Sequence, residues 1–331
     1  MTTPLRWGIL GAGIIANKFA DAVRREAGNE LVAVASKTPD KARDFAARHG
    51  IEAAPDYDTM LADPRIDVVY VATTHNFHHE NARRVLEHGR HCLVEKPFTV
   101  NAAQAEDLVE RAQERGLFLM EAMWSRFLPT WQAVRARVAD GVIGEVRQID
   151  VTFGGIVPPH YERRLKEPEL AGGVTLDMGV YPIALICHVL GERPRHVESM
   201  TRMSTTGVDE VACYLFRFPG QCLTTISTSF DLWMPARAAF HGTRGTIEHA
   251  DFPWSETFRI HHHGGTGQVD EVEEIHTPLE ENGFVYQVRE VAARIAAGAT
   301  ESGVVPLHET IEIMHLMDGM RERWGLRYPF E

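Results

Sequence analysis

Three side chains at two places in the chain could carry out acid–base chemistry. Lys96 follows an apolar segment predicted to be a buried strand, and a lysine at the carboxyl end of a parallel strand points into the crevice where such sheets bind ligands. Asp177 and Tyr181 are four residues apart, so they share one face if their segment is helical. A tyrosine, with an unperturbed pKa of about 10, acts near neutral pH only when a cation stabilises its phenolate. Lys96 could be that cation, and purely structural roles remain the alternative.

A glycine-rich turn near the N-terminus indicates which cofactor would accompany these acid–base groups. Residues 8–16 have the order apolar strand, glycine turn, helix. Gly11 allows a sharp turn, Gly13 lets the backbone approach a pyrophosphate, and Ala16 allows close packing of helix and strand. The exposed amides at the helix start would bind the phosphates of a dinucleotide. A tight turn in some other α/β protein is the alternative.

The residues after the second predicted strand favour NADP(H). An acidic side chain there would bind the free ribose 2′-hydroxyl of NAD. The chain has Ser36 and Lys37 instead, and a hydroxyl beside a cation suits a 2′-phosphate. NAD remains possible, since Ser36 could cap the next helix, Lys37 could be solvated and Asp40 could bind the ribose.

Composition and charge limit the class of protein. The net charge of −12 opposes binding to nucleic acid or to anionic membranes. We expect no signal sequence, and no apolar run that approaches the length of a membrane span. Four cysteines lie in apolar runs without paired spacing, which predicts buried thiols in a reducing cytoplasm; they are Cys92, Cys187, Cys213 and Cys222.

Histidine and tryptophan clusters allow other interpretations, which the sequence does not favour. His75, His78 and His79 have no partner motif for a metal ion. Residues 261–263 are consecutive histidines in a predicted strand, so they point to alternate faces and no metal site is predicted. Trp233 and Trp254 could line a sugar-binding cleft, but core packing is the expectation for both.

The order of predicted elements indicates two domains. Up to about residue 122, short apolar strands alternate with helices, as parallel βαβ units require. Beyond a helix ending near residue 141, alternating apolar residues predict antiparallel strands to about residue 263. A helix over 173–190 interrupts this region, and a last helix begins near residue 308. The expected fold class is α/β, with a dinucleotide-binding Rossmann domain over 1–122 and a second, α+β domain over 123–331.

Capping residues mark several helix boundaries. Thr38 and Pro39 predict an N-cap followed by proline at the first helical position. Asn101, with Gln104 three residues later, resembles a capping box that opens a helix ending at Gly116.

These motifs, in this order, resemble the glucose–fructose oxidoreductase and inositol dehydrogenase (Gfo/Idh/MocA) family. The likeness spans nearly the whole chain and is carried by the glycine turn, by Glu95-Lys96-Pro97 and by the Gly-Gly segment leading to Asp177. Residues 121–129 and Tyr181 resemble the branch with dimeric dihydrodiol dehydrogenase and NADP-dependent xylose dehydrogenases. The resemblance implies that the second domain is built on a large, mostly antiparallel open sheet. The open face of that sheet often forms a dimer interface, which implies a homodimer or higher homo-oligomer.

The resemblance also implies a set of site residues. Lys96, Asp177 and Tyr181 match the catalytic set, and Tyr181 stands where many relatives have histidine. The pyrophosphate turn is matched by Gly11, Gly13, Ile14 and Ile15, and the adenosine phosphate site by Ser36 and Lys37. Positions lining the cofactor are matched by Thr73, Asn76, His78, Glu95, Lys96, Trp124 and Arg126. Two positions depart from the pattern: Lys37 replaces a common arginine and Thr74 a frequent proline.

The expected activity is hydride transfer between NADP(H) and a sugar, polyol or cyclic trans-diol, as in aldose 1-dehydrogenases or dihydrodiol dehydrogenases. Tyr181 takes the hydroxyl proton, Lys96 lowers the tyrosine pKa and binds the reacting oxygen, and Asp177 orients the substrate or the tyrosine. The alternative is a non-catalytic regulatory protein that senses sugar and binds the cofactor. The presence of both Lys96 and Tyr181 argues against it.

Overall fold

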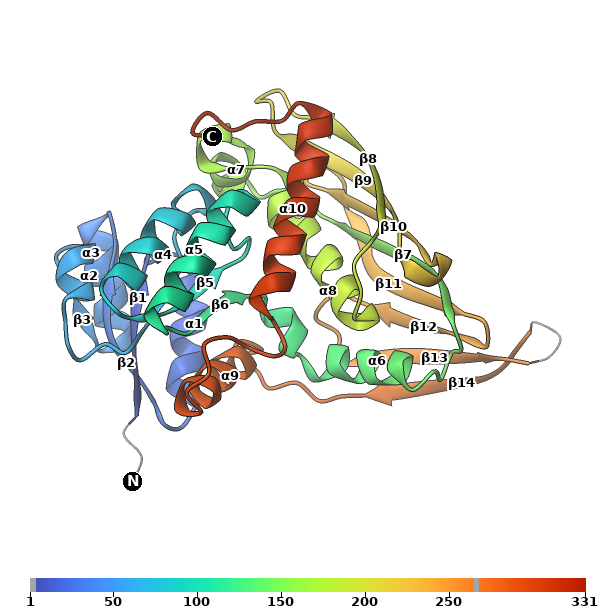
Figure 1. Ribbon diagram of the computed structural model, residues 1–331, viewed down its shortest axis with the longest axis horizontal. Coiled ribbons are helices and arrows are strands. Elements are labelled where there is room, and N and C mark those ends of the chain that lie inside the picture. Colours follow the sequence, from blue (N-terminus) through green and yellow to red (C-terminus); the bar gives the residue numbers. More distant parts are fainter. Residues whose placement is uncertain (1–3, 265–267) are drawn as a thin grey trace. The chain divides into compact units, whose positions relative to one another are not determined.

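The computed structural model describes residues 4–264 and 268–331 (Figure 1). The chain forms two compact units. The first ends at Trp124 and includes Glu280–His315; the second consists of Ser125–Leu279 and Leu316–Glu331. The sequence places residues 280–315 in the second domain, whereas in the structure they cluster with the first. The reason is packing between distant segments: the Asn282 amide donates to the Lys18 carbonyl at 2.8 Å, and the Leu119 N–H donates to the Thr300 carbonyl at 3.0 Å.

The first unit contains a parallel six-stranded sheet with the order β3-β2-β1-β4-β5-β6. Its strands are β1 (Leu5–Leu10), β2 (Asn29–Ala35), β3 (Glu52–Ala53), β4 (Val68–Val71), β5 (His91–Glu95) and β6 (Leu119–Ala122). All four residues of β4 are fully buried, as expected where helices cover both faces of a sheet. The strand order reverses between β1 and β4, and such sheets bind ligands beyond the carboxyl ends of their strands at this point.

The helices of the first unit confirm the capping predictions. They are α1 (Ile14–Arg25), α2 (Pro39–His49), α3 (Tyr57–Leu61), α4 (His78–Glu87), α5 (Ala102–Arg115) and α9 (Val285–Ala296), and α10 (Leu307–Trp324) begins here. Asn101 accepts the N–H of Gln104 at 3.0 Å, while the Gln104 side chain accepts the N–H of Val100 at 3.2 Å. Helix α5 ends at Gly116 with φ of +62°, and α2 begins at Pro39 after Thr38.

The second unit is built on an eight-stranded open sheet with the order β14-β13-β12-β11-β7-β10-β9-β8 (Figure 1). Among the strands in the described residues, only β7 and β10 of this sheet pair in parallel, so the predicted mostly antiparallel sheet is confirmed. Its strands are β7 (Val146–Gly154), β8 (His196–Met203), β9 (Asp209–Arg217), β10 (Leu223–Ser229), β11 (Met234–Gly242), β12 (Gly245–Ala250), β13 (Thr257–His263) and β14 (Val269–His276). The helices α6 (Pro129–Ala139) and α8 (Val180–Leu190) pack on each other, and a short π-helical turn, Thr175–Gly179, leads into α8.

Several elements lie outside the predictions from sequence, among them β3, α3, β14, α7 (Pro159–Lys166) and α9. Strand β14 is an edge strand with mostly charged, exposed side chains, so it lacks the alternation that marks a half-buried strand. Helix α7 buries only Leu165 and has no apolar stripe of its own.

Several expectations about individual side chains are wrong. Trp233 and Trp254 are 76% and 48% exposed, so neither is a core residue. Cys213 is exposed, whereas the other three cysteines are buried as predicted. Alternation along β9 explains the difference, because Cys213 lies on the outward face between the buried residues Ala212 and Tyr214.

One helical segment in the described residues, Pro168–Leu190, is long and apolar enough to cross a membrane by length and composition. The expectation that no apolar run has that length is therefore wrong. Within the protein 83% of its most apolar window is buried, which is the burial of a core helix, and length and composition alone are weak evidence for a membrane span.

Candidate active site

The two glycines of the N-terminal turn are required for different reasons. Gly11 has φ of +103°, and a Cβ at this position would lie 2.5 Å from the carbonyl oxygen of Ala72, in the loop after β4. Gly13 has φ of −85°, and no atom lies within 4 Å of the place where its Cβ would be. Gly11 therefore allows the backbone to turn and pack, while Gly13 leaves the start of α1 open.

The start of α1 fits a pyrophosphate. Gly13 is its N-cap residue and supplies no side-chain hydrogen bond, and the first turn, all of it described, contains no acidic side chain. The first N–H groups of a helix lack partners inside the helix and carry a partial positive charge. A bound dinucleotide phosphate would satisfy them, with Ile14, which is 66% exposed, beside it.

Ser36 and Lys37 follow β2 at the same edge of the sheet. The Ser36 hydroxyl accepts the N–H of Thr38 at 3.2 Å. The ammonium of Lys37 lies 3.3 Å from the centre of the Phe77 ring, so its charge is held by a cation–π contact. Asp40, the possible ribose ligand, has its carboxylate engaged by Arg43. This arrangement keeps a hydroxyl and a cation at the end of β2, while the carboxylate of Asp40 is paired with Arg43.

His78 connects the loops that follow β4 and β5. Its side chain is fully buried; Nδ1 lies 2.8 Å from the carbonyl oxygen of Pro97, and Nε2 lies 3.1 Å from that of Thr73. The Thr73 hydroxyl accepts a bond from Asn81 at 3.2 Å, and the Thr74 hydroxyl donates to Asn76 at 2.7 Å. These contacts stabilise the loops that carry Thr73, Asn76 and Lys96.

Glu95 holds the backbone at the end of β5. It is 5% exposed; Oε1 accepts the hydroxyl of Tyr70, and Oε2 accepts the backbone N–H of Lys96 at 3.2 Å. Lys96 itself is half-buried. The carboxyl edge of one sheet thus brings together the residues that follow β1, β2, β4 and β5.

Lys18 is a cation beside these residues that the sequence does not reveal. Its ammonium lies 5.2 Å from the Trp124 ring centre and 4.8 Å from that of Phe284. Burial lowers the pKa of Lys18, and the negative charge of Glu95 opposes the shift. The contacts come from α1 and from the segment before α9, so no local spacing indicates them.

The second unit holds Asp177 and Tyr181 one turn apart on one continuous helical segment. Asp177 lies in the π-helical turn and Tyr181 in the first turn of α8, and each is 9% exposed. Arg164 donates to the Asp177 carboxylate at 2.7 Å. The Tyr181 ring packs edge-on against Phe153, with ring centres 6.1 Å apart. The sequence does not reveal Arg164, because it lies on α7, thirteen residues before Asp177.

Arg126 and Trp124, both predicted to line the cofactor, are buried in different units. Arg126 is 1% exposed and donates to the Ala184 carbonyl of α8 at 2.9 Å. It lies beside His188, whose pKa is lowered to about 3, first by burial and then by the charges of Arg126 and Arg135. Trp124, which is 4% exposed, contacts Phe284 in the first unit with ring centres 5.2 Å apart.

Two histidines from the clusters considered as metal sites pair with carboxylates instead. His79 pairs with Asp107 at 2.8 Å, and His261 with Glu248 at 3.0 Å. Within the described ranges, no group of three or more histidine, cysteine or acidic residues is arranged to hold a metal ion.

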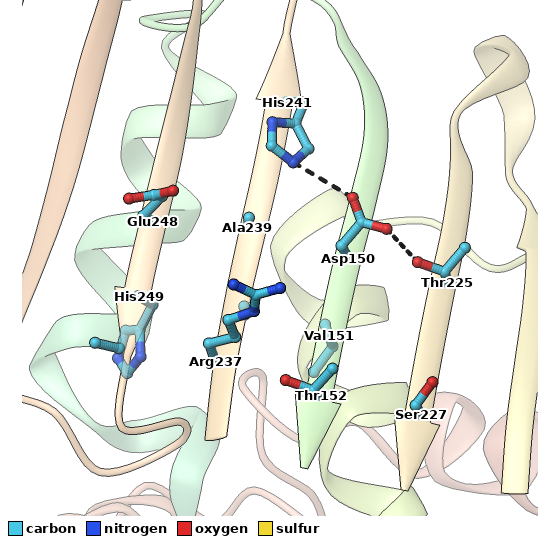
Figure 2. A pocket seen from close by; sticks show the side chains of 12 residues that line it. Asp150, Val151, Thr152, Thr225, Ser227, Arg237, Ala239, His241, Glu248 and His249 are labelled. Atoms are coloured by element: carbon cyan, nitrogen blue, oxygen red, sulfur yellow. Dashed lines mark hydrogen bonds and ion pairs between the residues drawn. The ribbon is translucent and has the colours of Figure 1, made fainter. Parts of the chain in front are cut away.

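A pocket of about 400 Å³ lies on the second unit's sheet (Figure 2). Thr152, next to the Phe153 that packs on Tyr181, lines this pocket. Here Asp150 accepts a bond from Thr225 and pairs with His241 at 3.3 Å. The pocket also contains Arg237 and Glu248, so this open face carries charges of both signs.

Both units match models of one protein family. Residues 5–123 match the model described as "Oxidoreductase family, NAD-binding Rossmann fold", and residues 131–248 match the "GFO/IDH/MocA C-terminal domain". Trans-1,2-dihydrobenzene-1,2-diol dehydrogenase of Xenopus tropicalis is 33% identical over 333 residues, covering 98% of this chain and 99% of that protein. The chain belongs to the Gfo/Idh/MocA family. The human enzyme of the same name is 30% identical over 334 residues, covering 98% of each chain.

Solved structures share the fold of this chain. The 3-ketoreductase KijD10 from Actinomadura kijaniata, in complex with NADP and TDP-benzene, superposes with a TM-score of 0.86 at 26% identity, covering 97% of this chain and 98% of that one. The aldose-aldose oxidoreductase of Caulobacter crescentus, with glycerol, shares the fold with a TM-score of 0.84 at 22% identity and the same coverage. The family comprises NAD(P)-dependent dehydrogenases and reductases, and the first unit is its NAD(P)-binding Rossmann domain.

Proposed function

We propose that this protein is an NADP(H)-dependent dehydrogenase or reductase acting on a CH–OH or carbonyl carbon of a sugar, polyol or cyclic trans-diol. The observation that carries the proposal is the pair formed by Asp177 and Tyr181, in which a carboxylate held by Arg164 and a phenol stand one turn apart. This pair lies in the unit that accompanies an NAD(P)-binding Rossmann domain. The nicotinamide, when bound, supplies the hydride acceptor or donor.

The roles of the chain's own residues follow from their chemistry. In the oxidative direction Tyr181 accepts the proton of the substrate hydroxyl at its phenol oxygen. Lys96 stabilises the phenolate by its positive charge and binds the reacting oxygen, which requires it to meet Tyr181 at the same substrate. Asp177, oriented by Arg164, binds a second substrate hydroxyl or orients Tyr181. In the reductive direction the same phenol returns the proton to the carbonyl oxygen.

The substrate class and the cofactor rest on the relatives and on the end of β2. Curated relatives over the full length are trans-1,2-dihydrobenzene-1,2-diol dehydrogenases, and KijD10 is a 3-ketoreductase solved with NADP and TDP-benzene. Variants of KijD10 with a tyrosine changed to phenylalanine or a lysine to alanine are also known in complex with both ligands. A vicinal diol, or the corresponding keto sugar, therefore suits the site. Ser36 and the cation of Lys37, which stacks on Phe77, support NADP over NAD.

The assembly and the compartment are further parts of the proposal. The pocket on the second unit's sheet carries Asp150 and Glu248 together with Arg237 and His241, so side chains of both kinds are available to pair with a second copy across a two-fold axis. We propose a homodimer through this face, which sedimentation of the wild type and of Arg237→Glu would test. A reversed charge at the interface would shift the protein toward the monomer. The unpaired thiols of Cys92 and Cys222 suit a reducing cytoplasm.

The activity is tested with the purified protein, NADP or NAD, and a panel of aldoses, cyclic trans-diols and, in reverse, keto sugars, by absorbance of the reduced nicotinamide. We expect turnover with at least one diol or aldose, and a loss of about 10²–10⁴ in kcat for Tyr181→Phe with unchanged cofactor affinity. Tyr286→Phe on α9, which removes a phenol hydroxyl outside the site, is the matched control. Tight cofactor binding without turnover on any compound would favour the regulatory alternative, and full turnover in Tyr181→Phe would refute the proton transfer.

A further inference from the structure

A buried carboxylate lies behind the turn that carries Asp177 and Tyr181. Asp209, at the start of β9, is fully buried, and its Oδ2 accepts both the backbone N–H of Thr175 at 2.7 Å and the Thr175 hydroxyl. Its Oδ1 has no hydrogen-bond partner among the described residues. Burial raises the pKa of Asp209, and the two bonds from Thr175 oppose the shift. Burying a carboxyl group with an unsatisfied oxygen lowers the stability of the fold, which suggests that Asp209 has a specific role at this turn.

Thr175 is also tied to the sheet by hydroxyl groups. Its Oγ1 lies 2.8 Å from the hydroxyl of Tyr214 on β9, and that hydroxyl lies 3.1 Å from Thr228 on β10. All of these side chains are buried. The network therefore runs from the turn to two adjacent, paired strands of the sheet.

Glycines at both ends of the turn allow this close approach. A Cβ on Gly173 would lie 2.1 Å from Oδ1 of Asp209, and one on Gly179 would lie 2.7 Å from the hydroxyl of Tyr214. Gly173 also has φ of +128°, which side chains rarely tolerate. The backbone thus lies close to Asp209 at Gly173 and close to Tyr214 at Gly179.

The geometry of the turn depends on Thr175. The N–H of Val180 donates to the Thr175 carbonyl, five residues back, which is the bond that defines a π-helical turn. Such turns are rare and frequent at functional sites, because they change the direction of the side chains they contain. Asp177 lies inside this turn and Tyr181 follows it. Whatever holds Thr175 therefore sets how Asp177 and Tyr181 point.

We propose that Asp209 is a positioning residue for the reaction. By holding Thr175 it stabilises the widened turn that directs Asp177 and Tyr181, with Tyr214 as a second support. The proposal rests on the proposed function, in which those two side chains handle the substrate. Asp209 itself is buried and acts only through Thr175.

Three substitutions test this role in the full-length protein. Thr175→Val keeps the shape but removes the hydroxyl, Asp209→Ala removes both acceptor bonds, and Asp209→Asn keeps an amide oxygen that can accept them. Thr130→Val is the matched control, because Thr130 is a buried hydroxyl in the same unit, 2.8 Å from the Ser255 carbonyl and 2.7 Å from Thr277, away from the turn. For each variant we would measure kcat, cofactor Kd and amide hydrogen exchange over residues 173–182.

We expect Thr175→Val and Asp209→Ala to lower kcat by about 10–100-fold, because misplacement of about 1 Å has this effect. Cofactor Kd should stay at the wild-type value, and the amides of Thr175 and Val180 should exchange faster. Asp209→Asn should recover most of kcat, and Thr130→Val should leave both kcat and exchange in the turn unchanged.

The proposal is overturned if Thr175→Val and Asp209→Ala retain wild-type kcat, or if Asp209→Asn is as impaired as Asp209→Ala. Failure of the proposed function is a separate result, namely no turnover by the wild type. In that case amide hydrogen exchange still tests whether Thr175 holds the turn. Faster exchange in the turn of Thr175→Val alone supports the positioning role, and equal exchange in Thr175→Val and Thr130→Val refutes it.

Discussion

Gly11 and Gly13 belong to one motif, but their replacement by alanine should have different effects. Gly11→Ala should mainly lower stability, whereas Gly13→Ala should mainly weaken cofactor binding. Gly11 has a positive φ, which costs an alanine about 1–2 kcal/mol. Its methyl group would also lie 2.5 Å from a backbone oxygen, and such overpacking costs about 1–3 kcal/mol. Alanine also lowers the conformational entropy of the unfolded chain, which offsets about 0.4–1 kcal/mol of this loss of stability. We expect Gly11→Ala to lower the free energy of unfolding of the first unit by about 2–4 kcal/mol.

Gly13→Ala meets neither obstacle. Its φ of −85° is ordinary and no atom lies within 4 Å of the added methyl group, so the stability loss should be only about 0.5–1 kcal/mol, because alanine is the poorer N-cap. The methyl group would instead stand where a pyrophosphate approaches the first amides of α1. We expect the Kd for NADPH to rise at least about tenfold, which corresponds to about 1.4 kcal/mol.

Urea unfolding followed by tryptophan fluorescence, with Trp7 fully buried in the first unit, measures the stability of both variants. Nicotinamide fluorescence on titration measures cofactor Kd. The reasoning is refuted if Gly13→Ala destabilises the protein as much as Gly11→Ala does, or if Gly13→Ala binds NADPH as tightly as the wild type.

Substitutions at three further positions test other parts of the site and core. Lys37→Glu should lower kcat/KM with NADP at least about tenfold relative to kcat/KM with NAD. Lys37→Arg should raise the preference for NADP, because a guanidinium binds a phosphate through two hydrogen bonds. An unchanged ratio of kcat/KM with NADP to kcat/KM with NAD in both variants would contradict the assignment of Lys37. Arg164→Met should lower kcat/KM about tenfold without affecting cofactor Kd, since Asp177 loses its charged partner at 2.7 Å, and unchanged kcat/KM would show that this ion pair does not orient Asp177. His249 is buried against Trp131, and burial lowers its pKa to about 4. In the unfolded chain the pKa of a histidine is about 6.5, so below pH 6.5 the unfolded state binds the proton more readily than the folded state does. The free energy of unfolding therefore falls as the pH falls. His249→Phe should therefore reduce the stability lost between pH 7 and pH 5 by about 2 kcal/mol, as measured by urea unfolding at each pH, and an identical pH dependence in the variant would refute this.

Local sequence patterns predicted the first unit well. Apolar runs marked β4 and β5, Asn101 with Gln104 marked the start of α5, and Gly116 marked its end. Each of these signals acts within a few residues, through backbone conformation, capping bonds or continuous burial. The same local rules failed for β14 and α7, whose exposed, charged residues contain no periodic apolar face.

Residue type and position in the chain by themselves determined the glycine turn, the lysine after β5 and the Asp177–Tyr181 spacing, because strand ends and helix periodicity are local properties. Only the tertiary structure decided which groups accompany them. Arg164 on Asp177, Asp209 beneath Thr175, and Lys18 between Trp124 and Phe284 are contacts between residues far apart in the chain. Such contacts depend on how elements pack, and no spacing along the chain records them.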